Sequence, residues 1–259
     1  MKYENKLVVV EVSEHIALLT LNNPPLNILT LEMTAELRRT LHTLEVDENV
    51  RVVVIRGSGE RAFCAGADIK EFPQVWDDVI GKKLLNENLA VDEIELLEKP
   101  VIAAMEGNVL GGGCEIALAC DIRIMSESGR IGLPEINLGV FPGSGGLFRL
   151  ARHVGLSKAY EMLYTGEILT AEQAKQISLV SHVVEAGTTE KKARELAAVI
   201  ASKPAEAIKL IKRGVRQLWQ KPTEEIFRAN LELSKQVFQT EDCAEGVDAF
   251  IHKRTPRFK

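Results

Sequence analysis

The chain has 259 residues, of which 46% are hydrophobic and 27% charged, and its formal net charge is −5. This composition is ordinary for a globular protein with a substantial core and excludes a mainly disordered chain. The acidic balance argues against a nucleic-acid partner, because such binding depends on clustered excess cations.

Membrane and metal signals are missing from the sequence. The longest aliphatic runs are of strand length, far short of the roughly 20 residues of a spanning helix, and the start lacks the pattern of an export signal. The four cysteines form no CxxC pair and the five histidines are scattered. We expect a protein of a reduced, cytoplasmic compartment, with no metal and no membrane partner.

The first half alternates short β-branched runs with helical patterns. Strands are predicted over residues 7–12, 16–21, 51–56, 101–105 and 121–125. Helices are predicted over 31–44, 75–97 and 112–119, and the stretch 57–66 as a loop. The order strand, glycine turn, helix, strand predicts a largely parallel sheet.

The second half is mostly helical. A helix over 144–153 is expected to end at Gly155, and Thr170 with Gln173 forms a capping box that opens a short helix. One strand is predicted over 179–184, and helices follow Lys192. Two apolar stripes mark these helices: Ile208, Ile211, Val215 and Leu218 in one, and Phe227, Leu231 and Phe238 in the other. We expect an α/β body over 1–190 and a helical C-terminal region over 191–259.

Two clusters of small residues follow predicted strands. Ala65, Gly66 and Ala67 let the backbone approach a ligand closely, although read alone they fit a simple surface loop about as well. Gly111, Gly112 and Gly113 open a helix, where exposed N–H groups and the helix dipole attract a negative oxygen. A dinucleotide-binding loop is excluded because GxGxxG is absent, whereas close packing of helix on strand stays an alternative.

Two acidic residues stand in apolar surroundings. Glu115 projects from the first turn of the glycine-started helix, and Glu135 follows Pro134 before another apolar stretch. Burial raises the pKa of a carboxyl group, so both are candidates for general acid and base catalysis. For either residue alone, an ordinary structural pairing with helix amides or an arginine is the simpler interpretation.

The motifs in this order resemble the crotonase superfamily, the enoyl-CoA hydratase/isomerase family, over essentially the whole chain. The matching segments are Asn22-Asn23-Pro24 with Asn27, Ala65-Gly66-Ala67-Asp68-Ile69-Lys70, Gly111-Gly112-Gly113-Cys114-Glu115, Pro134-Glu135, Pro142-Gly143-Ser144-Gly145-Gly146 and Lys253-Arg254-Thr255-Pro256-Arg257-Phe258. The resemblance implies a spiral of ββα units and a helical C-terminal region that trimerises, commonly as a dimer of trimers.

The resemblance also implies an activity and its residues. The ligand would be an acyl-coenzyme A thioester. Because coenzyme A is part of this substrate, no separate cofactor is expected. Backbone N–H groups of Ala67 and Gly112 would form an oxyanion hole, worth on the order of 3 kcal/mol for each donor. Glu115 would deprotonate a water that attacks C3 of a trans-2-enoyl-CoA, and Glu135 would deliver a proton to C2.

Further residues are implied at the edges of the site. Ala65, Asp68, Ile69 and Lys70 would line the coenzyme A site, and Lys253 of a neighbouring subunit would reach its phosphates; solvated surface lysines remain an equal alternative. Phe72, Trp76 and Phe141 would line the acyl pocket or belong to the core.

The chain departs from the family pattern at one place. Leu147 and Phe148 stand where many hydratases have a polar pair, which leaves ring-containing or branched substrates open, along with double-bond isomerisation through Glu135 alone. Thioester hydrolysis is a minor option on the same fold, and an RNA-binding role is a non-enzymatic one. A serine hydrolase is disfavoured because Ser144 lies outside a GxSxG motif.

Overall fold

The computed structural model describes residues 2–4, 6–217, 225, 232 and 234–258. Within these ranges the main sheet has seven strands in the order β1-β2-β3-β4-β6-β8-β11. They are β1 (Lys2–Glu4), β2 (Val8–Ser13), β3 (Ile16–Leu21), β4 (Val52–Gly57), β6 (Val101–Met105), β8 (Ile122–Ser126) and β11 (His182–Val184). The first two pairings are antiparallel, and those from β3 to β11 are parallel. The predicted parallel character is therefore confirmed beyond β3.

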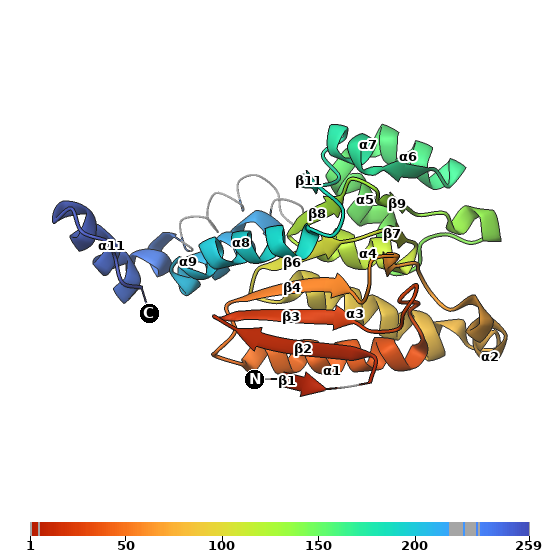
Figure 1. Cartoon of the computed structure of the whole chain (residues 1–259), viewed down its shortest axis with the longest axis horizontal. Helices are drawn as coiled ribbons and strands as arrows, with labels where there is room; N and C mark the ends of the chain where they lie inside the picture. Colours follow the sequence, from red (N-terminus) through yellow and green to blue (C-terminus); the bar gives the residue numbers. More distant parts are fainter. Residues whose placement is uncertain (1, 5, 218–224, 226–231, 233, 259) are drawn as a thin grey trace.

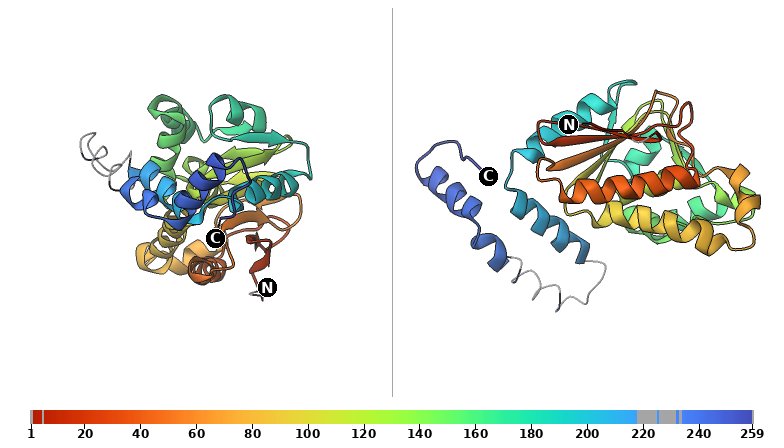
Figure 2. Two further views of the ribbon diagram at one scale, coloured as in Figure 1. Left: turned by 90° about the vertical axis from the view of Figure 1, so that its left-hand side faces the viewer. Right: turned by 90° about the horizontal axis from the view of Figure 1, so that it is seen from below.

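The central strands are buried on both faces, as their continuous aliphatic runs require. In β4, Val53 and Ile55 belong to one core, and Val52 and Val54 to the other. Helices α1 (Leu31–Val46), α3 (Leu85–Leu96) and α4 (Gly112–Ala119) cover the first face. Helix α8 (Thr189–Ala201) covers the second through Ala193 and Ala197. Figure 2 shows α1 and α3 side by side beneath the sheet.

A second sheet lies beside the first and corrects one prediction. Within the described chain it has four strands in the order β10-β9-β7-β5. They are β5 (Ala62–Cys64), β7 (Asn108–Leu110), β9 (Arg130–Gly132) and β10 (Ile168–Thr170). The stretch 57–66, predicted as a loop, thus contains β5. Three-residue strands are too short to show a periodicity in sequence, so their pairing depends on neighbours far along the chain.

The predicted helix over 75–97 is also interrupted. Short turns η1 (Ile69–Glu71) and α2 (Phe72–Val75) come first, followed by a π-helical turn η2 (Ile80–Leu84) that leads into α3. Asp78 accepts a hydrogen bond from Gly81 N at 2.9 Å, which favours a local turn over a continuous helix.

The second half is helical as predicted. Its elements are η3 (Glu135–Leu138), α5 (Gly146–Val154), α6 (Leu156–Thr165), α7 (Ala171–Gln176), α9 (Ala205–Gln217) and α11 (Glu241–Ile251). The capping box at Thr170 and the cap at Gly155 are both confirmed. Leu218, Phe227 and Leu231 of the predicted stripes lie outside the described residues. Figure 1 shows α11 projecting from the body, whereas α8 lies on the main sheet.

In the described residues, no helix is both long and apolar enough to cross a membrane.

Candidate active site

The loop after β5 is held against the segment before α1. Leu29 N donates to Gly66 O, and Asp68 N donates to Leu29 O, each at 2.9 Å. Below this pairing, the fully buried Asn27 donates from Nδ2 to Ala62 O at 2.7 Å. In this parallel bridge the residue between the two bonds directs its own N–H away from the partner strand. That residue is Ala67.

The first turn of α4 lies directly against this loop. A β-carbon at Gly113 would lie only 2.1 Å from Cys64 O, so the helix approaches β5 as closely as glycine permits. A β-carbon at Gly112 would lie 3.8 Å from Ala67 N. Among the described residues, neither the Ala67 nor the Gly112 N–H donates to a protein acceptor. Two N–H groups without a protein acceptor thus lie close together at the positive end of α4.

Glu115 lies one turn into α4 and its side chain is buried. Its Oε1 atom accepts hydrogen bonds from Ser144 N at 2.7 Å and from Gly146 N at 2.9 Å. The pKa of Glu115 is raised to about 7, mainly by burial and also by the negative charges of Glu135 and Glu87, against the opposing effect of these two bonds. A carboxyl group in this setting exchanges a proton near neutral pH.

Glu135 opens η3 and lies close to the same space. Its Oε1 would lie 3.3 Å from a β-carbon at Gly111, the residue before Gly112. Its Oε2 is buried and has no hydrogen-bond partner in the described part of the chain. Burial raises the pKa of Glu135, since an unpartnered buried oxygen favours the protonated form. The structure therefore brings Glu115, Glu135, Ala67 and Gly112 together.

The predicted coenzyme A residues lie at the surface beside the loop or far along the chain. Ala65 and Asp68 are half-buried, and Asp68 Oδ1 caps η1 by accepting from Lys70 N at 3.0 Å. Ile69 and Lys70 are exposed. Lys253 is exposed in the turn after α11, with a φ of 53°.

The aromatic residues predicted for an acyl pocket, Phe72, Trp76 and Phe141, differ in their surroundings. Trp76 and Phe141 are 75% and 66% exposed, and Phe72 lies under the Lys83 ammonium group. A narrow cavity of about 10 Å³ does adjoin Gly112. Its lining is Leu29, Thr34, Leu37, Glu87, Ala90, Val91, Gly112, Ile116 and Ser144.

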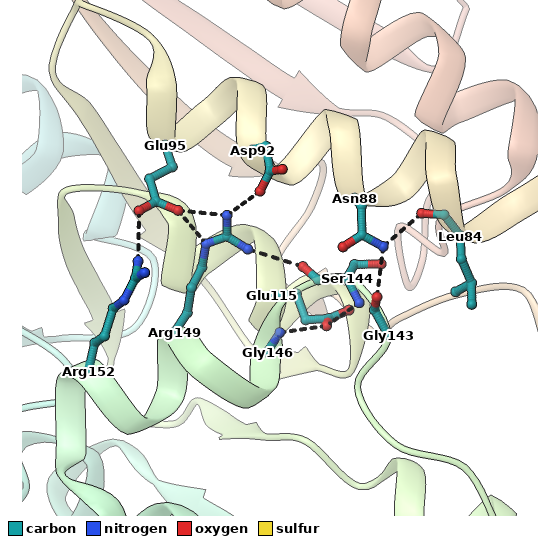
Figure 3. Close-up of polar contacts among 10 residues, drawn as sticks. All are labelled: Leu84, Asn88, Asp92, Glu95, Glu115, Gly143, Ser144, Gly146, Arg149 and Arg152. Atoms are coloured by element: carbon teal, nitrogen blue, oxygen red, sulfur yellow. Dashed lines mark hydrogen bonds and ion pairs between the residues drawn. The ribbon is translucent and has the colours of Figure 1, made fainter. Parts of the chain in front are cut away.

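Leu147 and Phe148 lie half-exposed on the outer side of α5, at 42% and 46%. The Phe148 ring packs under the guanidinium groups of Arg149 and Arg152, at 4.7 and 5.0 Å. Sequence reasoning missed Arg149, which is buried behind the site (Figure 3). Its ion-pair partners lie more than fifty residues away on α3, and nothing in a helix that begins Gly-Leu-Phe-Arg indicates such pairing.

Within the described ranges, no three histidine, cysteine or acidic side chains are grouped to hold a metal ion.

The raised pKa of Glu115 predicts a pH-dependent cost to folding. The pKa of Glu115 is about 7 in the folded protein and 4.5 for the free side chain. The contribution of this difference to the unfolding free energy is complete below about pH 4.5 and is lost as the pH rises through 7. Glu115→Gln keeps an acceptor for both N–H groups and does not titrate. Relative to this variant, the wild type should lose about 3 kcal/mol of unfolding free energy between pH 4.5 and pH 8.5.

Denaturant unfolding of both proteins at the two pH values and at one protein concentration measures this difference. The comparison with Glu115→Gln removes the pH dependence that other groups impose on both proteins. A difference in unfolding free energy that stays constant with pH would contradict a raised pKa at Glu115.

Comparison with known proteins agrees with the resemblance found in the sequence. The family model described as enoyl-CoA hydratase/isomerase matches residues 11–259. A short-chain-enoyl-CoA hydratase of Clostridium acetobutylicum is 39% identical over 95% of both chains. A 2,3-dehydroadipyl-CoA hydratase of Escherichia coli is 38% identical, over 97% of this chain and 98% of its own.

The crystal structure of an enoyl-CoA hydratase from Bacillus anthracis superposes with a TM-score of 0.94 at 37% identity, covering 98% of this chain and 99% of its own. The two sheets and C-terminal helices are thus those of the crotonase fold. The chain belongs to the enoyl-CoA hydratase/isomerase family.

Proposed function

We propose that the protein is an enoyl-CoA hydratase, which adds water across the C2=C3 bond of a trans-2-enoyl-CoA to give a 3-hydroxyacyl-CoA. The observation that carries the proposal is the placement of two carboxyl groups with raised pKa values beside two unpaired backbone N–H groups. Hydration needs one group to take a proton from water, one to give a proton to carbon, and an anion site for the intermediate between them.

The N–H groups of Ala67 and Gly112 would receive the thioester oxygen. Addition of oxygen at C3 moves the π electrons of the double bond through C2 onto this oxygen, which becomes an enolate. Preorganised donors are worth most when charge develops at the atom they face. The first turn of α4 adds its dipole to the same point.

The two carboxyl groups differ in a way that suggests their roles. Both N–H bonds to Glu115 end on Oε1 and stabilise its ionised form, which leaves Oε2 to take a proton from water. The unpartnered Oε2 of Glu135 favours the acid, which would protonate C2 and so complete the addition. Since each charge affects the other, the pair titrates as a unit.

The surface segment formed by Ala65, Asp68, Ile69 and Lys70 would hold coenzyme A beside the loop, with Lys253 supplied by a neighbouring subunit. Phe72, Trp76 and Phe141 would contact the acyl group where it leaves the site. The relatives named for short-chain and dehydroadipyl substrates show that the family accepts different acyl groups on similar chains.

The direct test is loss of the conjugated-thioester absorbance of a short trans-2-enoyl-CoA. Glu115→Gln and Glu135→Gln should each lower kcat by about 10²- to 10⁴-fold, because each removes one proton-transfer step. Glu127→Gln, which changes an exposed glutamate after β8, is the matched control and should retain activity.

Each outcome of that assay has a meaning. A wild type that binds coenzyme A and leaves the conjugated substrate unchanged refutes hydration of that acyl group. Movement of a β,γ double bond into conjugation, with Glu115→Gln active, would favour the isomerase instead. Release of free thiol would indicate a thioester hydrolase.

Two neighbouring glycines test the anion site. At Gly112, an added methyl group meets only the end of Leu29 at 3.0 Å and lies 3.8 Å from Ala67 N, so it fills the space between the two donors. Gly112→Ala should fold with little change in stability, since its one close contact is the end of the flexible Leu29 side chain. It should nevertheless lose 100-fold or more in kcat, on the order of one lost donor.

Gly113→Ala is the matched comparison. Its methyl group would overlap the backbone oxygen of Cys64, so α4 must move from β5 and the protein should lose several degrees of thermal stability. Thermal unfolding and hydration rates of both variants give the answer. Normal activity in a stable Gly112→Ala protein would argue against an anion site between these residues.

We also propose that the C-terminal region 191–259 assembles the protein into a trimer or a dimer of trimers. The support is exposed apolar surface: Ile211 and Val215 of α9 are 61% and 57% exposed, and Ile251 of α11 is 66% exposed. Exposed apolar patches of this kind commonly mark subunit contacts. Sedimentation equilibrium should give three or six times the chain mass, and a monomer at micromolar concentration would refute the assembly.

A further inference from the structure

The turn over 143–146 supplies both hydrogen bonds that hold Glu115, and Arg149 lies behind it (Figure 3). We infer that Arg149 is a positioning residue, which fixes this turn and thereby the orientation of the Glu115 carboxyl group. The catalytic part of this inference rests on the proposed hydratase function, whereas its structural part concerns the site alone.

Arg149 ties the turn to α3. Its side chain is 3% exposed; Nη2 donates to Asp92 Oδ1 at 2.6 Å and Nε to Glu95 Oε2 at 2.7 Å. The third arm, Nη1, donates to Ser144 O at 3.2 Å. A planar guanidinium with three fixed partners sets a position more firmly than a single ion pair does.

Only the backbone of the turn separates the Arg149 guanidinium from the Glu115 carboxyl group. A β-carbon at Gly145 would lie 2.0 Å from Arg149 Nη1, and one at Gly146 would lie 3.0 Å from Glu115 Oε1. Gly145 has a φ of +89°, which favours glycine independently of space. If the guanidinium moves, we expect the Ser144 and Gly146 N–H groups that bond Glu115 to move with it.

A second side chain fixes the start of the same turn. Asn88 of α3 donates from Nδ2 to Gly143 O at 2.7 Å and to Leu84 O at 2.8 Å. Asn88 of α3 thus holds Gly143, and Arg149 of α5, which is paired with α3, holds Ser144; neither side chain forms a hydrogen bond or an ion pair with Glu115. Catalytic groups need placement to about half an ångström, and misplacement by about 1 Å can cost 100-fold in rate.

The charges around Glu115 set the expected direction of a change. Glu87 of α3 and Glu135 of η3 are the charged groups that raise its pKa, and the hydrogen bonds from Gly146 and Ser144 lower it. Arg149 faces the Ser144 carbonyl rather than the carboxylate. If the turn loosens, the two N–H bonds weaken and the pKa of Glu115 rises.

Arg152 provides a matched control. It donates to the other oxygen of Glu95 at 3.1 Å and packs on the same Phe148 ring at 5.0 Å. In the described chain Arg152 contacts Glu95 and Phe148, and it makes no hydrogen bond or ion pair with the turn. Arg149→Lys and Arg152→Lys each keep the charge and remove the planar fork from a partner of Glu95, but only Arg149 is buried, paired with Asp92 and bonded to Ser144 O.

The test compares kcat, KM and the pH profile of hydration for the wild type and both variants. Arg149→Lys should lower kcat by about 10- to 100-fold, leave KM within about twofold, and move the pH limb that belongs to Glu115 to higher pH. Arg152→Lys should stay within about twofold of the wild type throughout. An Arg149→Lys protein that loses thermal stability but keeps kcat and the pH profile overturns the inference.

A second measurement separates this inference from the proposed reaction. The carboxyl carbon of Glu115 can be titrated by ¹³C NMR, with Glu115→Gln for assignment, whether or not hydration occurs. An upward shift of the titration in Arg149→Lys alone supports the positioning role even if the wild type proves inactive as a hydratase. Equal titrations in all three proteins overturn it.

Should Arg149→Lys fail to fold, Asn88→Ala takes its place. This variant removes the donor to Gly143 O from the same turn and leaves the Arg149 ion pairs intact. The same fall in kcat and upward titration of Glu115 are expected, and an unchanged kcat and titration would overturn the inference.

Discussion

The candidate site depends on the close approach of the first turn of α4 to the end of β5. The Cys64 carbonyl occupies the position that any side chain at 113 would need, so the two backbones touch there. This contact places the Gly66–Ala67 peptide beside Gly112, which brings the two N–H groups close together. Neither the small sheet nor the helix forms the proposed anion site alone, because each contributes one of the two N–H groups.

The same helix start explains why Glu115 can be buried. Glu115 N donates to Gly111 O, which places Glu115 one helical turn after the start of α4, where the Gly112 N–H lies. A carboxylate without partners would be too costly at this depth. The turn before α5 reduces that cost with two N–H donors, and the residual effect of burial holds the pKa near 7. Burial and hydrogen bonding therefore act in opposite directions on one group, which keeps it able to exchange protons.

The long elements could be predicted from the sequence, whereas the short ones could not. Continuous aliphatic runs such as 52–55 and the helical spacing of Leu37, Leu41 and Leu44 are signals within one element. Strands β5, β7, β9 and β10 have three residues each, and their existence depends on pairing across the chain. The helix over 75–97 was overestimated in length because a turn at Asp78 and Gly81 interrupts it.

The residues of the candidate site also divide into those that the sequence indicates and those that it does not. Glu115 and Glu135 stood out because acidic residues in apolar surroundings are unusual at sequence level, and the structure places them together. Arg149 and Asn88 gave no such signal: an arginine or asparagine in a helix is ordinary, and their partners lie on another element. Candidate catalytic acids such as these can thus be anticipated from their local sequence context. The residues that hold them in place can be found only from the fold.

The buried Arg123 provides a contrast with Glu135. Arg123 is buried beside the end of α4, where its donors meet Leu179 O at 2.8 Å and Cys120 O at 2.6 Å. Its last arm contacts His153, whose pKa is lowered to about 4 by burial and the nearby Arg123 charge, so that the ring stays neutral.

Arg123 is satisfied from several directions and serves to join elements. Glu135, by contrast, keeps a buried oxygen without a donor in the described chain, beside two N–H groups without acceptors. Such polar groups lower the stability of a folded protein unless something else completes them. The grouping of this oxygen with two N–H groups around Gly112 is the physical reason to expect that a bound molecule completes the hydrogen bonding there.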